Sequence, residues 1–334
     1  MPENDHRTLN DLGPAVEESG TERRGSSAHV GATCGEGRLG LGQAVMSEQP
    51  VMIVTGATNG IGEAAAIELA RRGAHLGIVA RNPRKAEATV ARMATAAPGA
   101  SVDVFLGDLA LMNDVRRVAS ELSDRYERID VLVNNAGIQL PEQRTTREGF
   151  PEMVAVNYLA PWLLTSLLRD RLEASAPARV VVTASEGHRI GGTIDPQTIL
   201  TDTSPFGRGG VMVAYGKSKL LDILFTLELA ERLTGTGVTA NCCCPGLVAT
   251  GLSGTDTRAD RVAKTLSATP LVRRPDQGAR VLVRLATDPA LATRTGEFIS
   301  STPLAGLLPT MPTVRDVALR RRLWDETEAL LAAT

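Results

Sequence analysis

The chain has 334 residues, of which 43% are hydrophobic, and its 36 basic and 38 acidic residues leave a net charge of −2. This composition is typical of a globular protein with a sizeable core, and not of a disordered one. The near-neutral charge and the scarcity of aromatic residues (3%) argue against a nucleic-acid partner, and no apolar run reaches the roughly 18 residues of a membrane span.

Residues 1–48 differ in composition from the rest of the chain. They are rich in Gly, Ser, Glu and Arg, show no helical or strand periodicity, and contain no apolar segment of the kind found in a signal peptide. We therefore expect residues 1–48 to be a disordered extension of a cytoplasmic protein. Met46 lies just before the first expected strand, which gives the hypothesis that translation naturally begins there.

From residue 49 to residue 334, short apolar runs alternate with longer amphipathic ones. Strands are expected at residues 52–55, 75–80, 102–106, 131–134, 179–183, 238–243 and 297–300. Helices are expected at residues 61–72, 84–94, 112–126, 146–173, 213–233, 259–266, 276–286 and 314–331. Strands that alternate with helices of this length form βαβ units. The sequence predicts one α/β domain with a seven-stranded, mostly parallel sheet and helices on both faces.

A glycine-rich turn lies between the first expected strand and the first expected helix, in the run TGATNGIG at residues 55–62. Glycines allow a tight turn and a close approach of the backbone to a pyrophosphate, and the helix N-terminus offers free N–H groups to the phosphates. The alternative is an ordinary turn. The residues expected at this nucleotide site are Gly56, Thr58, Asn59, Gly60, Ile61 and Gly62.

Arg81 follows the second expected strand, where an acidic residue would bind the ribose 2′-hydroxyl of NAD(H). An arginine pairs instead with a 2′-phosphate, and Arg84 and Lys85 add to the positive field. Arg81 therefore favours NADP(H) over NAD(H) as the cofactor. The alternative is that Arg81 is a solvated loop residue and that the choice of cofactor is made elsewhere.

Tyr215 and Lys219 lie four residues apart in an expected helix, which places both side chains on one face. An unperturbed phenol loses its proton near pH ~10, and a neighbouring ammonium favours the phenolate, so the pair is suited to acid–base chemistry. Ser185 follows the fifth expected strand, from where its hydroxyl can bond a substrate oxygen that becomes negatively charged. The alternative for Ser185 is a helix N-cap.

With these residues the chain resembles the short-chain dehydrogenase/reductases from Val51 to the last helix. The resemblance rests on the glycine spacing and on Asp108, residues 134–137, Asn157, Ser185, Tyr215, Lys219, Pro245, Gly246 and Thr250. Within that family it resembles the branch of retinol-dehydrogenase-like and WW-domain-oxidoreductase-like proteins, on residues 81–82, 185–189 and 322–324. The resemblance implies a single doubly wound Rossmann domain.

The resemblance also implies a function, the transfer of a hydride between NADP(H) and a carbonyl or alcohol substrate. Tyr215 would be the acid/base and Ser185 would bond the substrate oxygen. Lys219 would assist Tyr215 and bond the nicotinamide ribose, and Asn157 would hold a water. The further cofactor contacts implied by the resemblance are Asp108, Leu109, Asn135, Ala136, Gly137, Pro245, Gly246, Val248 and Thr250.

Four smaller interpretations complete the sequence analysis of the site. Asn134 is expected to satisfy backbone groups between adjacent strands, and His188 is expected to be a solvated loop residue and not a general base. The residues after Lys219 read Leu-Leu-Asp, where relatives often have a small residue and an asparagine. We expect that departure to affect helix packing or oligomer contacts more than chemistry. Cys34 and the run at residues 242–244 lack metal-ligand spacing, so no metal is expected.

Segments at about residues 190–212 and 252–270 are expected to form the substrate loops. Their apolar residues, which suit an apolar carbonyl or alcohol, are Ile190, Ile199, Phe206, Val211, Leu252 and Leu266. Two other functions stay open: a non-catalytic NADP(H)-binding sensor or scaffold, and a sugar-nucleotide epimerase or dehydratase. The family often pairs its two long helices across a two-fold axis, so a homodimer or a homotetramer is also left open.

Overall fold

Seven parallel strands form the centre of the computed structural model, which describes residues 49–207, 209–248 and 273–334. The strand order is β3-β2-β1-β4-β5-β6-β7, and every neighbouring pair is parallel. The strands are β1 (Val51–Thr55), β2 (His75–Ala80), β3 (Val102–Leu106), β4 (Val131–Asn134), β5 (Ala178–Thr183), β6 (Val238–Cys244) and β7 (Phe298–Ser300). The predicted seven-stranded Rossmann domain is confirmed.

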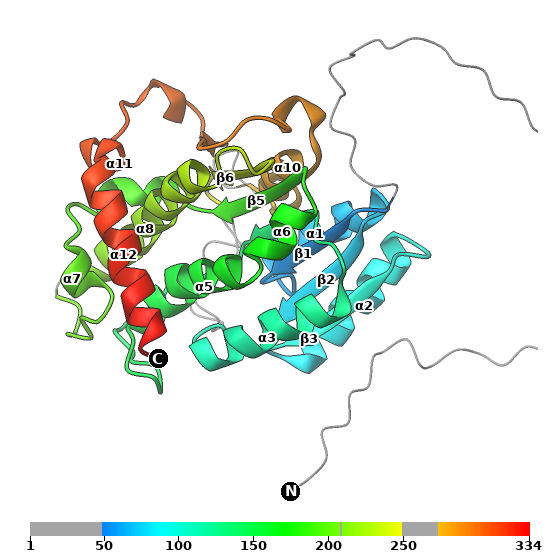
Figure 1. The fold of residues 1–334 in the computed structure, drawn as a ribbon, viewed down its shortest axis with the longest axis horizontal. Helices are drawn as coiled ribbons and strands as arrows, with labels where there is room; N and C mark the ends of the chain where they lie inside the picture. Colours follow the sequence, from blue (N-terminus) through cyan, green and yellow to red (C-terminus); the bar gives the residue numbers. More distant parts are fainter. Residues whose placement is uncertain (1–48, 208, 249–272) are drawn as a thin grey trace, which may run out of the picture.

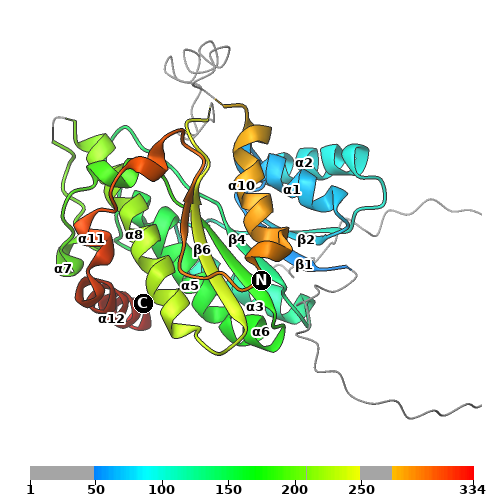
Figure 2. The same cartoon turned by 90° about the horizontal axis from the view of Figure 1, so that it is seen from above.

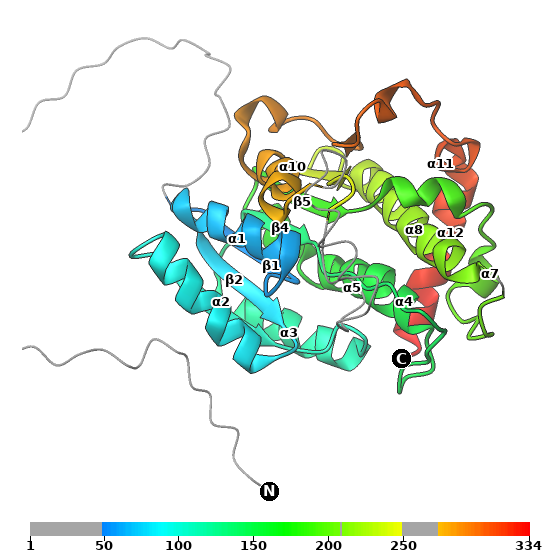
Figure 3. The ribbon, with the colours of Figure 1, turned by 180° about the vertical axis from the view of Figure 1, so that it is seen from behind.

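Two layers of helices cover the sheet (Figures 1 and 3). One face carries α1 (Gly60–Arg71), α2 (Pro83–Ala96) and α10 (Pro275–Thr287), which lie together on one side of the strands in Figure 2. The opposite face carries α3 (Met112–Arg125), α5 (Ala160–Leu167) and α8 (Gly210–Arg232). Each layer has its own buried cluster of apolar side chains. Strands covered on both faces explain the continuous apolar runs in the sequence.

The helix expected at residues 146–173 is wrong in its extent. Gly149 has a φ of +89° and Pro151 follows it, so the chain makes a turn, with a bridge between Thr145 and Pro151, before any helix begins. The helical part then consists of α4 (Glu152–Val154), a π-helical turn (Ala155–Leu159), α5 and α6 (Arg169–Ala174). The π turn contains Asn157, one of the residues predicted for the site.

The last helix also differs from its expected extent. It is divided into α11 (Pro312–Arg315) and α12 (Val317–Ala332), because the Asp316 carboxylate accepts a hydrogen bond from the Leu319 amide and caps a new helix. The short elements that remain are α7 (Pro196–Ile199) and 3₁₀ turns at Glu186–Ile190, Pro289–Leu291 and Ala305–Leu307. The expected extension at residues 1–48, and the helix and substrate loop expected at 259–266 and 252–270, lie outside the described residues.

Helix α12 packs against α8 through aromatic side chains. The Trp324 ring stacks on Phe225 with centroids 6.0 Å apart and lies 5.0 Å from the Trp162 ring. The guanidinium of Arg232 covers another part of the indole, 4.5 Å from its centroid. Trp324 therefore joins the C-terminal helix to the α8 layer. Among the described residues, no helix combines the length and the apolar character needed to cross a membrane.

Replacing Trp324 by alanine is expected to lower the free energy of unfolding by about 3–5 kcal/mol, because the change removes a buried ring and its aromatic partners. Urea denaturation followed by circular dichroism measures the change. Glu328→Ala, an exposed position on the same helix, is the control and should stay within about 0.5 kcal/mol of the unchanged protein. Equal stability of the two variants would contradict the role of Trp324.

Candidate active site

The turn after β1 leaves no room for side chains at its glycines. Gly56 and Gly60 have φ values of +68° and +57°, which favour glycine. A Cβ at Gly56 would lie 2.8 Å from the Ala136 Cα, and one at Gly62 would overlap the Gly56 carbonyl oxygen and the Asn135 amide. These contacts hold the turn against the end of β4. The glycine run therefore has the compact form that the sequence predicts.

Helix α1 begins at Gly60 with free N–H groups. Asn59 occupies the N-cap position in an extended conformation, and no side chain caps the helix. The one acidic residue of the first turn, Glu63, points toward α2, where Thr89 and Arg92 bond its carboxylate. The N-terminal amides and the helix dipole are thus available to an anion such as a phosphate.

Arg81 lies at the end of β2, beside the other residue predicted at the adenosine end of the cofactor. Its Nη1 is 3.8 Å from Oδ1 of Asp108, and its side chain is 65% exposed. An ion pair this long and this exposed is weak, so Arg81 can exchange it for a stronger anion. The Asp108 carboxylate also accepts a hydrogen bond of 3.0 Å from the Ala110 amide, which fixes the turn after β3.

The ends of β1 and β4 are joined by polar contacts. The Thr55 hydroxyl accepts hydrogen bonds of 3.0 Å from the amides of Asn135 and Ala136. The Asn135 side chain donates to the Thr55 carbonyl and accepts from the Thr183 hydroxyl of β5. Asn135 therefore joins three strand ends, the role that was expected of Asn134.

The expectation for Asn134 is wrong, because its amide points to the helix layer. Its Nδ2 donates to the Thr165 hydroxyl of α5 at 2.9 Å, and its Oδ1 has no partner. The two asparagines follow each other on a strand, so their side chains point to opposite faces and only one of them can reach the neighbouring strand ends.

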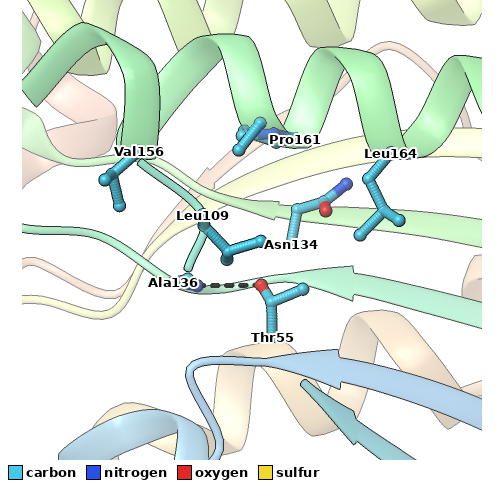
Figure 4. A pocket seen from close by; sticks show the side chains of 8 residues that line it. Thr55, Leu109, Asn134, Ala136, Val156, Pro161 and Leu164 are labelled. Carbon is cyan, nitrogen blue, oxygen red and sulfur yellow. Dashed lines mark hydrogen bonds between the residues drawn. The ribbon is translucent and has the colours of Figure 1, made fainter. Parts of the chain in front are cut away.

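A small hollow lies next to the Thr55–Ala136 contact, between the strand ends and α5 (Figure 4). Leu109 and Ala136, two residues predicted to contact the cofactor, line it together with Val156, Pro161 and Leu164. The hollow has no room for a water molecule, so it is not itself a ligand site. It brings the turn after β3 next to the turn after β4.

Ser185 and Tyr215 meet across a contact between glycines. The second turn of α8 touches the 3₁₀ turn Glu186–Ile190, since a Cβ at Gly216 would lie 2.6 Å from the Gly187 carbonyl oxygen. A Cβ at Gly187 would lie 3.2 Å from the Ser185 Oγ and 3.3 Å from Cε1 of Tyr215. The hydroxyl and the ring thus flank the same small space.

Ser185 also fulfils the alternative that the sequence left open. It is the N-cap of the 3₁₀ turn, and its Oγ accepts a hydrogen bond of 3.0 Å from the Gly187 amide. A hydroxyl has two lone pairs and one proton. Capping uses one lone pair, so the O–H of Ser185 can still donate to a substrate oxygen.

Lys219 lies one turn after Tyr215 with its ammonium buried. Its Nζ is 6.0 Å from the centre of the Tyr215 ring and donates hydrogen bonds of 2.8 Å to the Thr183 carbonyl and 2.9 Å to Oδ2 of Asp222. Burial, the largest influence, lowers the pKa of the Lys219 ammonium, but the charges of Asp222 and Tyr215 more than offset it and raise that pKa above its ordinary value. The ammonium therefore stays charged at neutral pH.

Hydrogen bonds of its side-chain amide fix the position of Asn157. Its Oδ1 accepts from the Ile138 amide at 2.8 Å, and its Nδ2 donates to the Ile138 carbonyl and to the Ser218 hydroxyl. The side chain therefore has little capacity left for the water that the sequence assigned to it. Gly137 packs beside it, since a Cβ there would lie 3.4 Å from both Asn157 Oδ1 and Lys219 Nζ.

The turn after β6 packs against Arg273 and α10, and it contains residues predicted to contact the cofactor. Gly246 has a φ of +88°, and a Cβ there would lie 3.2 Å from Cδ of Arg273. Val248 pairs with Arg273 in a parallel bridge and contacts Gly278 of α10. Pro245 and Ile61 reach the same glycine. Ile61, Pro245 and Val248, all predicted to contact the cofactor, therefore pack against α10 at Gly278. Thr250 lies outside the described residues.

His188 is not solvated as expected but buried. Its Nδ1 lies 2.8 Å from the Ser185 carbonyl oxygen, and its ring packs edge-on against Phe298. Burial lowers the pKa of this imidazole, which favours the neutral form. The three cysteines of β6 are buried and unbridged, and within the part of the chain that the structure describes no cluster could hold a metal ion.

Sequence reasoning missed the residues that position the predicted ones. Thr55, Thr183 and Ser218 bond Asn135, Lys219 and Asn157, but isolated hydroxyl residues give no signal in a single sequence. Asp222 did give a signal, as a departure from the usual pattern. It was expected to affect helix packing or oligomer contacts, and in the structure its buried carboxylate contacts the Lys219 ammonium.

Comparisons with known proteins identify the family of the chain. The family model described as short chain dehydrogenase matches residues 50–194. Human retinol dehydrogenase 13 is 36% identical over 287 residues, which cover 84% of each chain. A Streptomyces protein assigned as a daunorubicin C-13 ketoreductase is 35% identical over 85% of this chain and 93% of its own.

A solved structure from Beutenbergia cavernae, assigned as an NAD(P)-dependent gluconate 5-dehydrogenase with bound NADP, is 28% identical. It covers 78% of this chain and 97% of its own, with a TM-score of 0.59. The chain belongs to the short-chain dehydrogenase/reductase family, so it is an oxidoreductase that uses a nicotinamide cofactor and a small-molecule substrate. Within the family it belongs to the retinol-dehydrogenase-like branch.

Proposed function

We propose that the protein is an NADP(H)-dependent oxidoreductase that interconverts an apolar carbonyl compound and its alcohol, with Tyr215 as the acid/base. The observation that carries the proposal is the meeting of three groups at the strand ends. The Tyr215 ring and the Ser185 hydroxyl flank one small space, and the Lys219 ammonium lies one helical turn away from the ring. These are the donors and the charge that reduction of a carbonyl requires.

The residues at the carboxyl ends of the strands suit the parts of a nicotinamide cofactor. The uncapped amides of α1 and the crowded Gly62 suit a pyrophosphate held close to the backbone. Arg81 and Asp108 would hold the adenosine end, and the turn with Gly246 and Val248 the nicotinamide end. Bound there, the nicotinamide supplies or accepts the hydride.

The chain's own side chains would handle the proton. Ser185 donates a hydrogen bond to the substrate oxygen, and Tyr215 gives that oxygen its proton. Lys219 has three N–H donors, of which two are used by Thr183 and Asp222. The third is left for the cofactor ribose or the phenol, while the positive charge favours the phenolate that remains.

Asn157 supports this site through the backbone. Its side chain is engaged with Ile138 and Ser218, and it lies in the π-helical turn Ala155–Leu159. A π turn inside a helix disturbs the regular backbone pairing and is frequent at functional sites. We assign the water contact to the main-chain carbonyl of this turn, in place of the side chain.

An apolar substrate is supported by the residues around the entrance. Ile190 follows the Ser185 turn, and Met212 and Val213 lie in the first turn of α8, ahead of Tyr215; all three are exposed apolar residues. The names of the retinol dehydrogenases agree, since retinol is a mostly apolar alcohol. Retinoid, steroid, quinone and aliphatic carbonyls are therefore the compounds to test.

The decisive experiment for the reaction is NADPH oxidation with that panel of carbonyls. We expect turnover with at least one apolar member and none without substrate. A protein that binds NADPH tightly but turns over no carbonyl in the panel, and no corresponding alcohol with NADP⁺, would instead favour the sensor or scaffold. A bound nucleotide sugar would favour the epimerase.

Arg81→Asp is expected to reverse the preference between the two cofactors. Loss of a charge-assisted pair with the 2′-phosphate removes about 1.5–3 kcal/mol, which is roughly a 10- to 100-fold rise in KM for NADPH relative to NADH. Steady-state kinetics with both cofactors measure the ratio. Arg315→Asp makes the same charge change on exposed α11 and should leave the ratio unchanged. An unchanged ratio in the Arg81 variant would place the choice of cofactor elsewhere.

A further inference from the structure

Asp222 stands one turn after Lys219 on α8 and forms a buried ion pair with it. Its Oδ2 lies 2.9 Å from the ammonium, and the two side chains are 1% and 5% exposed. The other carboxylate oxygen, Oδ1, is buried and accepts no hydrogen bond. An anion in this position is costly unless a cation compensates it, so the carboxylate and the ammonium depend on each other.

The surroundings of the pair contain few other charges. The π turn contributes Asn157 and Tyr158, and burial raises the pKa of the Tyr158 phenol. Strand β6 contributes Cys242 and Cys243, whose pKa values burial also raises. These groups are therefore neutral near pH 7.

The other neighbours carry no fixed charge. Strand β5 contributes the Thr183 carbonyl, and Gly137 after β4 packs against the ammonium. Among the groups of the described chain whose charge acts on the Lys219 ammonium, Asp222 comes first, followed by Tyr215 and Cys244. Burial raises the pKa of Asp222 to about 6, so this carboxyl is mostly ionised at neutral pH.

We propose that Asp222 is a positioning residue that anchors the Lys219 ammonium and, by its negative charge, weakens the field of that ammonium at Tyr215. The proposal deepens the proposed function, on which the meaning of the Tyr215 proton depends. A lone ammonium would favour the phenolate strongly, whereas an ammonium paired with a carboxylate favours it less. Asp222 thereby sets the pH range in which Tyr215 exchanges its proton.

The sign of the effect follows from the charges. Removing a negative charge from a cluster of titrating groups stabilises every form of the cluster that has lost a proton. Asn has nearly the shape of Asp and no charge, so Asp222→Asn makes that change with little alteration of packing. The phenol beside Lys219 is then expected to ionise at a lower pH than in the unchanged protein, by about one pH unit.

The three tyrosines of the chain allow a direct measurement. Burial raises the pKa of the Tyr126 and Tyr158 phenols. Loss of the first step of tyrosinate absorbance in Tyr215→Phe would assign that step to Tyr215. The titration needs neither cofactor nor substrate, so it stands apart from any assay of turnover.

The comparison is between the unchanged protein, Asp222→Asn and Glu228→Gln. Glu228 is a second buried carboxylate of α8, paired with Arg232 at 2.9 Å, and its replacement should leave the first tyrosinate step in place. In Asp222→Asn the tyrosinate step should move about one pH unit lower. The rise of the alcohol oxidation rate with pH should move in the same direction. Circular dichroism and thermal unfolding verify that each variant is folded.

Two outcomes would overturn the proposal. An unmoved step in folded Asp222→Asn would show that the carboxylate has only a packing role, and a step moved to higher pH would show that the ammonium loses its charge first. The tyrosinate step of Asp222→Asn could also move to lower pH while the unchanged protein turns over no carbonyl and no alcohol. That result would support the role of Asp222 and contradict the proposed function.

Discussion

Replacing Tyr215 by phenylalanine is expected to lower kcat/KM by about 10²- to 10⁴-fold, the usual contribution of a general acid. The change removes only the hydroxyl that would give its proton to the substrate oxygen. The ring that packs beside Gly187 remains, so this part of α8 should keep its place. The measurement is NADPH oxidation with a carbonyl found active in the panel, together with NADPH affinity, which should change little.

Tyr126→Phe is the matched control for that experiment. Tyr126 donates a hydrogen bond of 2.8 Å to Asp103 near the amino ends of β2 and β3. The candidate site lies at the other end of the strands, beyond their carboxyl ends. This variant loses a hydroxyl as well, yet its turnover should equal that of the unchanged protein. Undiminished activity of Tyr215→Phe would show that another group supplies the proton, and the proposed chemistry would be wrong.

Gly62→Ala is expected to weaken NADPH binding by roughly 10- to 100-fold. The added methyl group overlaps the Gly56 carbonyl and the Asn135 amide, and overpacking of this kind costs about 1–3 kcal/mol. Because one of those neighbours is backbone, relief requires the glycine turn to move away from the position that receives the phosphates. Fluorescence titration with NADPH measures the loss.

Gly207→Ala provides the comparison, since no heavy atom of the described residues lies within 4 Å of the added methyl group and its φ is not in the left-handed region. Its NADPH affinity should be unchanged. Thermal unfolding shows whether Gly62→Ala remains folded. A folded Gly62→Ala protein with full affinity would mean that the nucleotide does not approach this turn.

The sequence was sufficient for the sheet and for the groups that belong to a known pattern. Strand limits agree with the structure to within one or two residues, because apolar runs bounded by turns have few alternatives. The helix at residues 146–173 could not be predicted in its details. Its periodicity persists through Gly149 and Pro151, and the π turn around Asn157 depends on hydrogen bonds to Ile138 and Ser218, which are distant in sequence.

Roles that depend on the direction of a side chain were the least predictable. Asn134 ends β4 and Asn135 follows it, and the sequence does not show that the second asparagine reaches Thr55 while the first contacts Thr165. Asp222 has the helical spacing to face Lys219, but the spacing alone does not show that burial excludes solvent from the pair. Residue patterns predict which groups are candidates for the chemistry, whereas packing decides which other groups contact them.

The contact between Gly187 and Gly216 has a consequence for redesign of the enzyme. The chain from Ser185 to Gly191 is locked onto α8 by backbone atoms, whereas Gly192 and Gly209, with φ values of +67° and +73°, have open space around them. These two glycines are suitable positions at which to join a segment taken from another protein. Exchanging the stretch between them for that of a relative would test its predicted role in substrate specificity, while the serine and the tyrosine keep their mutual positions.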